Sequence, residues 1–478
     1  MLINHITSLL NSNLGHDPTE SQQSLINGIA DFILSKKEKE ILLIKGYAGT
    51  GKTTIVSSVV KTLNNLNTRS VLMAPTGRAA KILTAYSSKN AFTIHKKIYR
   101  QKSSKDGFGE FSLDKNFYSN SVFIVDEASM ITNISKDVSI FGSGKLLDDL
   151  LDYIYNGSNN KLILLGDIAQ LPPVGLDISP ALDKQVLKNY GYFVTEMFLK
   201  DVVRQSKDSG ILYNATYLRN LITTRKASIP KFYLKNFTDI VKISGTDLLE
   251  LITEAYNKSG IEGTVVIGRS NKMVNKYNQG IRSQILWRED EIVPGEYLMV
   301  VKNNYFWLQQ DEEPENSLDF IANGDIVEVV RVHKHEEYYN FRFADVTIRL
   351  IDHENKEINV KILLDTLLVE TAAMSNEDNR KLFYSITEEY EDVKPKKKRF
   401  EKVRNNPFFN ALQVKYAYAV TCHKAQGGQW DIVFVDQGYV SENNIDIEYL
   451  RWLYTGITRS TKELFLINFH DRFFEDSS

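Results

Sequence analysis

Residues 41–54 read ILLIKGYAGTGKTT, an apolar run that passes into a glycine-rich loop. The apolar run is typical of a buried β-strand, and residues 46–53 fit the pattern GxxxxGK followed by Ser or Thr. In such a loop, glycines allow a tight turn whose backbone N–H groups point at phosphate oxygens, and the next helix begins with its positive dipole end. The stretch therefore predicts a strand, a phosphate-binding loop and a helix.

Two side chains of this loop have distinct chemical roles. Lys52 is expected to reach the β- and γ-phosphates of a nucleoside triphosphate, and Thr53 is expected to ligate Mg²⁺. The remaining loop residues contribute backbone N–H groups or start the helix. The residues predicted to bind the nucleotide in this loop are Gly46, Gly49, Thr50, Gly51, Lys52, Thr53 and Thr54.

Composition restricts the class of protein. A chain of 478 residues with 42% hydrophobic and 25% charged residues is globular and long enough for about three domains. The single cysteine, Cys422, excludes an internal disulfide and a cysteine zinc cluster, and favours a buried filler in a reducing compartment. Apolar runs are too short to cross a bilayer, so we expect a cytoplasmic protein without membrane contact.

The first part of the chain, residues 1–200, alternates short apolar runs with helical or turn-rich stretches. This alternation predicts an α/β fold with a mainly parallel sheet. A second α/β unit is expected at residues 201–293 plus 411–478, interrupted by a β-rich, charged, barrel-like insertion at 294–410. A smaller hairpin or loop insertion is expected at 96–120. The predicted strands of the first unit are 41–44, 70–74, 122–125 and 161–165.

Polar residues follow two of these strands. Asp126 and Glu127 come directly after 122–125, where Asp126 can hold Mg²⁺ and Glu127 can accept a proton from an attacking water. Gln170 follows 161–165, and its amide can bond both a γ-phosphate and that water. Because ligands bind beyond the carboxyl ends of parallel strands, these side chains should meet the phosphate loop.

The ordered blocks resemble the superfamily 1 helicases, and within them the RecD- and Dda-like 5′-to-3′ DNA helicases of superfamily 1B. The resemblance covers essentially the full chain and implies two RecA-like parallel-sheet domains of the P-loop NTPase class, a small hairpin insertion and a larger SH3-like insertion. The blocks are PTESQ (18–22), APTGRAAK (74–81), DEAS (126–129), GDIAQLPPVG (166–175), VRQ (203–205), TCHKAQGG (421–428) and YTGITRS (454–460).

The resemblance assigns further roles. Gln22 is expected to read adenine, and Arg204 and Arg459 are expected to reach the γ-phosphate across a cleft between the two domains. The expected contacts with DNA are Thr76, Arg78, Lys81, His95, Phe408, Phe409, Thr421, His423 and Lys424. These combine basic groups for the backbone with flat side chains for the bases, although each aromatic could equally belong to the core.

The sequence of two segments allows two interpretations each. The small insertion is where the family carries a strand-separating pin, which nominates Phe108 and Phe111, but either residue could merely close a hairpin. The basic run at residues 394–404 could contact nucleic-acid phosphates or form a solvated loop. IANGDIVEVV at 321–330 is the best local match to the SH3-like module.

The predicted function is an ATP- and Mg²⁺-dependent helicase that translocates along single-stranded DNA and unwinds duplexes carrying a single-stranded tail. The 5′-to-3′ direction follows from the resemblance alone. One alternative is an RNA helicase or a translocase that displaces proteins. Another, of a different class, is a nucleotide-switched scaffold that binds nucleic acid with little hydrolysis.

Overall fold

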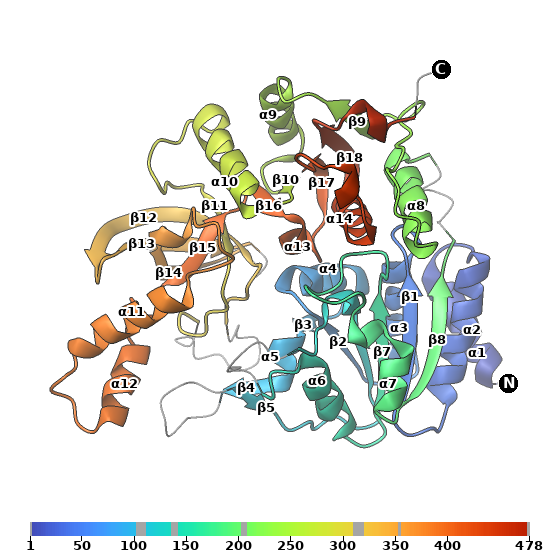
Figure 1. Ribbon diagram of the computed structural model, residues 1–478. Coiled ribbons are helices and arrows are strands. Elements are labelled where there is room, and N and C mark those ends of the chain that lie inside the picture. Colours follow the sequence, from blue (N-terminus) through green and yellow to red (C-terminus); the bar gives the residue numbers. More distant parts are fainter. Residues whose placement is uncertain are drawn as a thin grey trace.

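The computed structural model describes residues 2–101, 111–134, 142–201, 208–308, 320–351 and 355–475. Two parallel sheets and a closed barrel form its framework (Figure 1). The first sheet has the order β3-β2-β6-β7-β1-β8, and all its strands are parallel. Its strands are β1 (Glu40–Gly46), β2 (Ser70–Ala74), β3 (Ala91–Thr93), β6 (Val122–Val125), β7 (Lys161–Gly166) and β8 (Phe193–Leu199). The four predicted strands are thereby confirmed.

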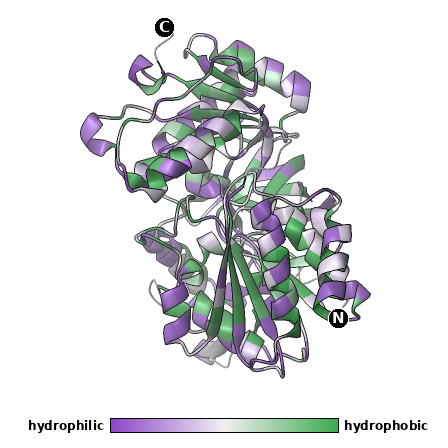
Figure 2. Ribbon diagram, turned by 90° about the vertical axis from the view of Figure 1, so that its right-hand side faces the viewer, coloured by the Kyte–Doolittle hydropathy of each residue, from purple (hydrophilic) through white to green (hydrophobic). Residues whose placement is uncertain are grey.

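Helices cover both faces of the first sheet. Alternate residues of β1 point to opposite sides, so that Leu42 and Ile44 join one core while Ile41 and Leu43 join the other. Figure 2 shows hydrophobic strands enclosed by helices whose outer residues are more hydrophilic. The helices of this unit are α1 (Leu2–Leu14), α2 (Glu20–Leu34), α3 (Lys52–Asn65), α4 (Gly77–Ser87), α5 (Ile94–Ile98), α6 (Leu146–Tyr155) and α7 (Lys184–Asn189).

The second sheet has the order β16-β10-β17-β18-β9 and is also parallel. Its strands are β9 (Ile240–Ile243), β10 (Thr264–Gly268), β16 (Ala419–Thr421), β17 (Trp430–Asp436) and β18 (Ser460–Ile467). Its helices are α8 (Gly210–Thr223), α9 (Leu248–Ser259), α10 (Asn271–Gly280), α13 (Cys422–Ala425) and α14 (Ile447–Ile457). The predicted α/β class with two RecA-like sheets is confirmed.

The insertion between the two halves of the second unit contains a closed barrel. Its strands are β11 (Tyr297–Val300), β12 (Ile326–Tyr338), β13 (Phe341–Leu350), β14 (Lys356–Leu363) and β15 (Leu412–Tyr416). The predicted β-rich module is therefore present, but it includes β15, which the sequence assigned to the second α/β unit from residue 411. The reason is that β15 pairs with both β11 and β14 and closes the barrel.

A pair of helices interrupts the barrel within the segment that was predicted to be β-rich. Helices α11 (Asn376–Glu388) and α12 (Lys396–Arg404) lie between β14 and β15 and project from the barrel (Figure 1). Leu382, Ile386 and Val403 are buried in a cluster beside the barrel. The spacing of these few apolar residues gives the charged helical pair an apolar face toward the barrel. Most of the basic run at 394–404 therefore forms α12 rather than a loop.

The small insertion contains a short antiparallel pair. Strands β4 (Tyr99–Gln101) and β5 (Phe111–Leu113) pair through Arg100 and Ser112. Phe108 lies outside the described residues. In the part of the chain that the structure describes, no helix combines the length and apolar character required for a bilayer crossing.

Candidate active site and nucleic-acid interface

The phosphate loop joins β1 to α3 through two left-handed glycines. Gly49 has φ 73° and Gly51 has φ 82°, a region that residues with a Cβ atom rarely adopt. Gly51 is the N-cap residue of α3, so Lys52, Thr53 and Thr54 form the first turn of that helix. Backbone geometry therefore favours glycine at positions 49 and 51.

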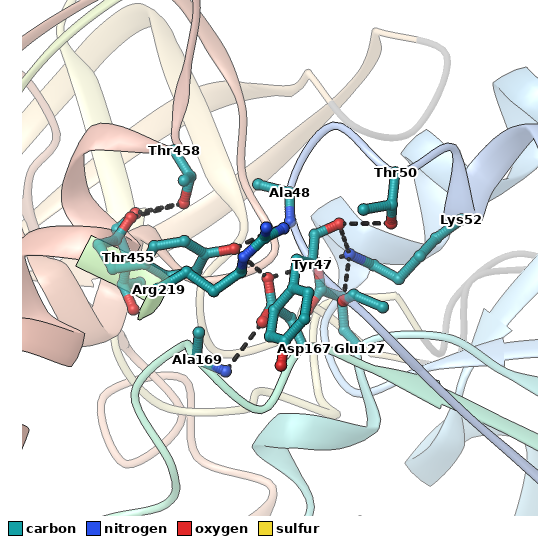
Figure 3. Close-up of polar contacts among 12 residues, drawn as sticks. Tyr47, Ala48, Thr50, Lys52, Glu127, Asp167, Ala169, Arg219, Thr455 and Thr458 are labelled. Atoms are coloured by element: carbon teal, nitrogen blue, oxygen red, sulfur yellow. Dashed lines mark hydrogen bonds and ion pairs between the residues drawn. The ribbon is translucent and has the colours of Figure 1, made fainter. Parts of the chain in front are cut away.

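Lys52 is held by the loop itself. Its Nζ donates hydrogen bonds to the carbonyls of Gly46 and Tyr47, each at 2.9 Å, and lies 4.0 Å from Asp167 Oδ2 (Figure 3). This arrangement concentrates a cation at the helix N-terminus, where an anionic phosphate is favoured. Phosphate oxygens would compete with the two carbonyls for the same ammonium group.

Gln22 supports the loop from inside the protein. Its side chain is fully buried and its Nε2 donates to the Thr50 carbonyl at 3.2 Å. Its Oε1 accepts from the backbone N–H of Thr19 in a capping box that starts α2. Gln22 thus braces the phosphate loop, and its predicted role as an adenine reader stays a prediction.

The carboxylates after β6 face this loop. Glu127 adopts a left-handed backbone with φ 52°, and its N–H donates to Asp126 Oδ1 at 2.8 Å. Burial, followed by the Glu127 carboxylate, raises the pKa of Asp126, while Lys52 acts in the opposite direction. Glu127 Oε2 is buried and accepts no hydrogen bond from any described residue. A buried, unused acceptor fits a group that orients water or metal-bound water.

Gln170 lies in the turn after β7, also with a buried acceptor. Its Oε1 has no hydrogen-bond partner among the described residues, and the side chain is almost fully buried. The next residue, Leu171, is held from the second domain: its N–H donates to Thr455 Oγ1 at 2.8 Å and its carbonyl accepts from Gln426 Nε2 at 2.7 Å. The segment carrying Gln170 is therefore fixed by both domains.

Of the two predicted phosphate-reading arginines, the structure describes one. Arg204 lies outside the described residues. Arg459 is buried in the second domain, where its Nε donates to the Thr455 carbonyl at 3.1 Å and its Nη1 to the Gly428 carbonyl at 3.2 Å. In this conformation it donates to carbonyls of its own domain, and its predicted role at the γ-phosphate stays a prediction.

Two residues of the site were missed from the sequence. Tyr454 of α14 lies in the YTGITRS block, but its hydroxyl accepts from the Ala48 N–H at 2.9 Å and donates to Asp167 Oδ2 at 2.7 Å. Arg219 of α8 places its guanidinium 4.5 Å from the ring centroid of Tyr47 (Figure 3). No motif in the sequence around Arg219 indicates a role at the nucleotide site, because α8 has the pattern of an ordinary amphipathic helix.

Several predicted DNA contacts meet where the two domains and the barrel adjoin. Arg78 lies 3.8 Å from the Trp430 ring centroid and donates to the Gln429 carbonyl at 3.0 Å. Lys81 donates to the Ile351 carbonyl at 2.8 Å. Thr76 caps α4 by accepting from the Ala79 N–H, and a Cβ on Gly427 would lie 2.8 Å from its Oγ1. The two α/β units are thus closely packed here.

The second domain contributes α13 to the same junction. Thr421 is the N-cap residue of α13, which carries His423 and Lys424. Lys424 Nζ donates to Asn323 Oδ1 of the barrel at 2.5 Å. Desolvation, with a smaller effect of Lys415, lowers the pKa of Lys424 to about 8, and desolvation also lowers the pKa of His423. The lowered pKa of Lys424 brings its titration closer to physiological pH.

The predicted aromatic contacts have different surroundings. His95 is half-buried on α5, 5.7 Å from Tyr99 between ring centroids, and desolvation lowers its pKa to about 4. Phe408 stacks on Tyr338 at 5.0 Å and Phe409 packs against Phe383 at 5.7 Å. The phenylalanine pair fills the contact between the barrel and α11, so the structure corrects its assignment from base stacking to packing.

Cys422 behaves as the small buried filler expected from the sequence. Its side chain is fully buried, and burial raises the pKa of its thiol to about 12. Its Sγ lies 3.5 Å from the Trp452 carbonyl of α14. The thiol therefore contributes to the packing of α13 on α14 rather than to nucleophilic chemistry.

Comparison with known proteins gives matches to two families. Residues 32–176 match the AAA domain, which includes the phosphate loop, Asp126, Glu127 and Gln170. Residues 416–467 match the UvrD-like helicase C-terminal domain, which includes α13 and α14. The two matches thus fall on the two parallel sheets whose facing segments form the site.

Similar proteins span nearly the whole chain. An uncharacterized protein of Acanthamoeba polyphaga mimivirus is 25% identical over 93% of this chain and 98% of its own length. The ATP-dependent DNA helicase dda of Enterobacteria phage T4 is 24% identical over 94% of this chain and 99% of its own length. Among solved structures, a Bacteroides Pif1 helicase in complex with ADP-AlF3 and ssDNA is 16% identical, covering 97% of this chain and 95% of that chain, with a TM-score of 0.47.

The matched domains, the full-length relatives and the ordered motifs support a superfamily 1B helicase. Among the similar proteins, the dda helicase and RecD fit the resemblance that the sequence blocks indicated. The geometry around the phosphate loop is that of a nucleotide site at the contact of two RecA-like domains.

Proposed function

We propose that this protein is an ATP-dependent DNA helicase that moves 5′-to-3′ along single-stranded DNA and unwinds duplexes with a single-stranded tail. One observation carries the proposal: the Tyr454 hydroxyl joins the phosphate loop at Ala48 and the β7 turn at Asp167 to the second domain. A nucleotide bound at the loop would thereby lie at the contact between two domains. Nucleotide binding and hydrolysis can then change the relative position of those domains.

Each side chain of the site would have a separate role in ATP hydrolysis. Lys52 would bind the β- and γ-phosphates after leaving the Gly46 and Tyr47 carbonyls. Glu127, whose buried Oε2 has no hydrogen-bond partner among the described residues, would take a proton from the attacking water. Gln170 would hold the same water against the γ-phosphate. Thr53 and Asp126 are the residues that would hold Mg²⁺, which neutralises charge on the phosphates.

The strand would bind where α4, α13 and the barrel adjoin. Arg78, Lys81 and Lys424 each donate to a protein oxygen at this junction. DNA phosphates offer stronger acceptors for these cations, since charge-assisted hydrogen bonds are about twice as strong as neutral ones. Contacts to the backbone from both domains would allow each domain to hold the strand in turn.

A tailed-duplex assay tests this function. The protein should unwind a duplex with a 5′ tail in the presence of ATP and Mg²⁺ and fail on the same duplex with a 3′ tail. Unwinding from the 3′ tail alone would reverse the direction, and stimulated ATPase without unwinding would favour a protein-displacing translocase.

DNA and RNA oligomers of equal length, compared as ATPase activators, separate a DNA helicase from an RNA helicase. No stimulated turnover with either would favour a nucleotide-switched scaffold.

A further inference from the structure

One tyrosine hydroxyl connects the two RecA-like domains at the nucleotide site. Tyr454 is 1% exposed, and its hydroxyl bonds Ala48 on the phosphate loop and Asp167 after β7. Burial raises the pKa of Tyr454 well above its ordinary value, so the hydroxyl keeps its proton. It therefore accepts from the Ala48 N–H and donates its only proton to Asp167. Both bonds cross from the first domain to the second.

The same network includes the phosphate-reading lysine. Lys52 Nζ lies 4.0 Å from the Asp167 oxygen that Tyr454 bonds, while carbonyls of the loop accept its hydrogen bonds. A phosphate group entering the loop competes for the ammonium group of Lys52 and for backbone N–H groups such as that of Ala48. Any such change redirects the Ala48 N–H from which Tyr454 accepts, or moves the Lys52 ammonium group relative to Asp167. The position of α14 therefore depends on the state of the loop.

The neighbouring residue of α14 makes a parallel contact. Thr455 Oγ1 accepts from the Leu171 N–H, directly after Gln170. Helix α14 thus touches both segments expected to contact the γ-phosphate through two successive residues. On its other side, α14 packs on α13 through the Trp452 carbonyl and Cys422, and α13 carries Lys424. A continuous set of contacts links the phosphate loop to a predicted DNA-binding helix.

We propose that Tyr454 is a positioning residue whose hydroxyl couples nucleotide binding at the phosphate loop to DNA binding at α13. The inference rests on the proposed helicase function and adds to it the group that transmits the signal. The coupling is thermodynamic: nucleotide changes the affinity for DNA, and DNA changes the affinity for nucleotide by the same factor. Without the hydroxyl, the two sites should bind their ligands independently.

The test uses Tyr454→Phe, which removes the hydroxyl and keeps the ring. The affinity for a fluorescent oligothymidylate is measured by anisotropy, without nucleotide and with a saturating nonhydrolysable ATP analogue plus Mg²⁺. The ratio of the two affinities is the coupling factor, which is typically about 5- to 150-fold in allosteric proteins. We expect a ratio in this range for the wild type and a ratio within about twofold of one for Tyr454→Phe.

Tyr449→Phe is the matched control. Tyr449 lies on the same helix, is 2% exposed, and bonds Gln437 within the second domain. Its variant should keep the wild-type ratio. A wild-type ratio in Tyr454→Phe, an equal loss in Tyr449→Phe, or a wild-type ratio of one would each overturn the inference. The tailed-duplex assay on the wild type judges the helicase function separately, so the two failures can be distinguished.

Discussion

The ring of Phe111 lies 4.3 Å from the ring of Tyr305, centroid to centroid. Phe111 is in β5 of the small insertion, and Tyr305 is in the segment that follows β11 of the barrel. Tyr305 also packs at 4.8 Å against Phe320. This aromatic contact fixes the small antiparallel pair of the first domain against the barrel of the second, although the two segments are far apart in the sequence.

Phe111→Ala should uncouple unwinding from hydrolysis. Removing the ring releases the antiparallel pair from the barrel, and an aromatic contact of about 1.4 kcal/mol corresponds to a tenfold effect. We expect unwinding of a 5′-tailed duplex to slow about tenfold while ATPase stimulated by single-stranded DNA stays within about twofold.

Two further variants test the cause. Tyr305→Ala should reproduce the defect if the contact with the barrel matters. Phe117→Ala, at an 85% exposed residue of the same segment, should not. Normal unwinding by Phe111→Ala would remove this residue from the strand-separating apparatus.

Lys52→Ala should abolish DNA-stimulated ATPase. The variant removes the ammonium group that the loop holds among the Gly46 and Tyr47 carbonyls and Asp167. Loss of one preorganised charge donor costs about 10²- to 10³-fold in turnover. Lys61→Ala, at an exposed lysine of the same helix α3, is the control. Stimulated hydrolysis at the wild-type rate in Lys52→Ala would refute the site assignment.

Glu127→Gln should lose turnover and keep nucleotide binding. The amide retains the shape of the side chain but cannot act as a general base, whose contribution is about 10²- to 10⁴-fold. Steady-state ATPase measures the loss, and titration with a fluorescent ATP analogue measures binding. Gln170→Ala should show the same separation, because Gln170 Oε1 is likewise buried without a described partner. A parallel loss of binding in both variants would instead indicate that the site has collapsed.

Lys424→Arg should flatten the pH dependence of DNA binding. The pKa of Lys424 is lowered to about 8, so the ammonium form dominates at pH 7 and the neutral form at pH 9. Only the charged form attracts phosphate, so affinity should fall as pH rises through about 8, by at most about tenfold per pH unit for one proton. Arginine stays charged throughout this range.

Anisotropy titrations at constant ionic strength give the profile for Lys424→Arg. Lys81→Arg makes the same change on the first-domain side of the junction. If Lys81→Arg flattens the profile and Lys424→Arg does not, the titrating cation is not Lys424.

Phe408→Ala should destabilise the protein without weakening DNA binding. Phe408 contacts Tyr338, Phe343 and the Lys361 ammonium, and forms part of the contact between the barrel and the helical pair. Truncation of a fully buried Phe costs about 3–5 kcal/mol, and roughly 2 kcal/mol is expected for this half-buried ring. Thermal unfolding should show the loss. Tyr384→Ala on the exposed face of α11 is the control, and a large fall in DNA affinity for Phe408→Ala would restore the base-stacking role.

Local sequence was sufficient for the strands and the phosphate loop. Residues 41–44 are apolar and form most of the buried strand β1. Gly49 and Gly51 occupy left-handed backbone that few other residues tolerate. The positions of Asp126, Glu127 and Gln170 followed from the rule that parallel strands end at one edge of a sheet. In each case the information lies within a few residues of the site.

Packing between distant segments decided the rest. β15 joined the barrel rather than the second sheet because β11 and β14 offered it partners on both edges. Phe408 entered an aromatic cluster because α11, α12 and the β12–β13 ribbon enclose it. An apolar side chain has no preference for a base over a core until the fold supplies its neighbours.

The sequence by itself determined a P-loop NTPase of two parallel sheets, because apolar periodicity and glycine positions act through local backbone geometry. Only the tertiary structure decided which groups meet across the domains. Tyr454 lies 406 residues from Ala48 and 287 from Asp167, yet its hydroxyl bonds both. Hydrogen bonds between residues so far apart in the sequence depend on how the two α/β units pack against each other, so no local pattern encodes them.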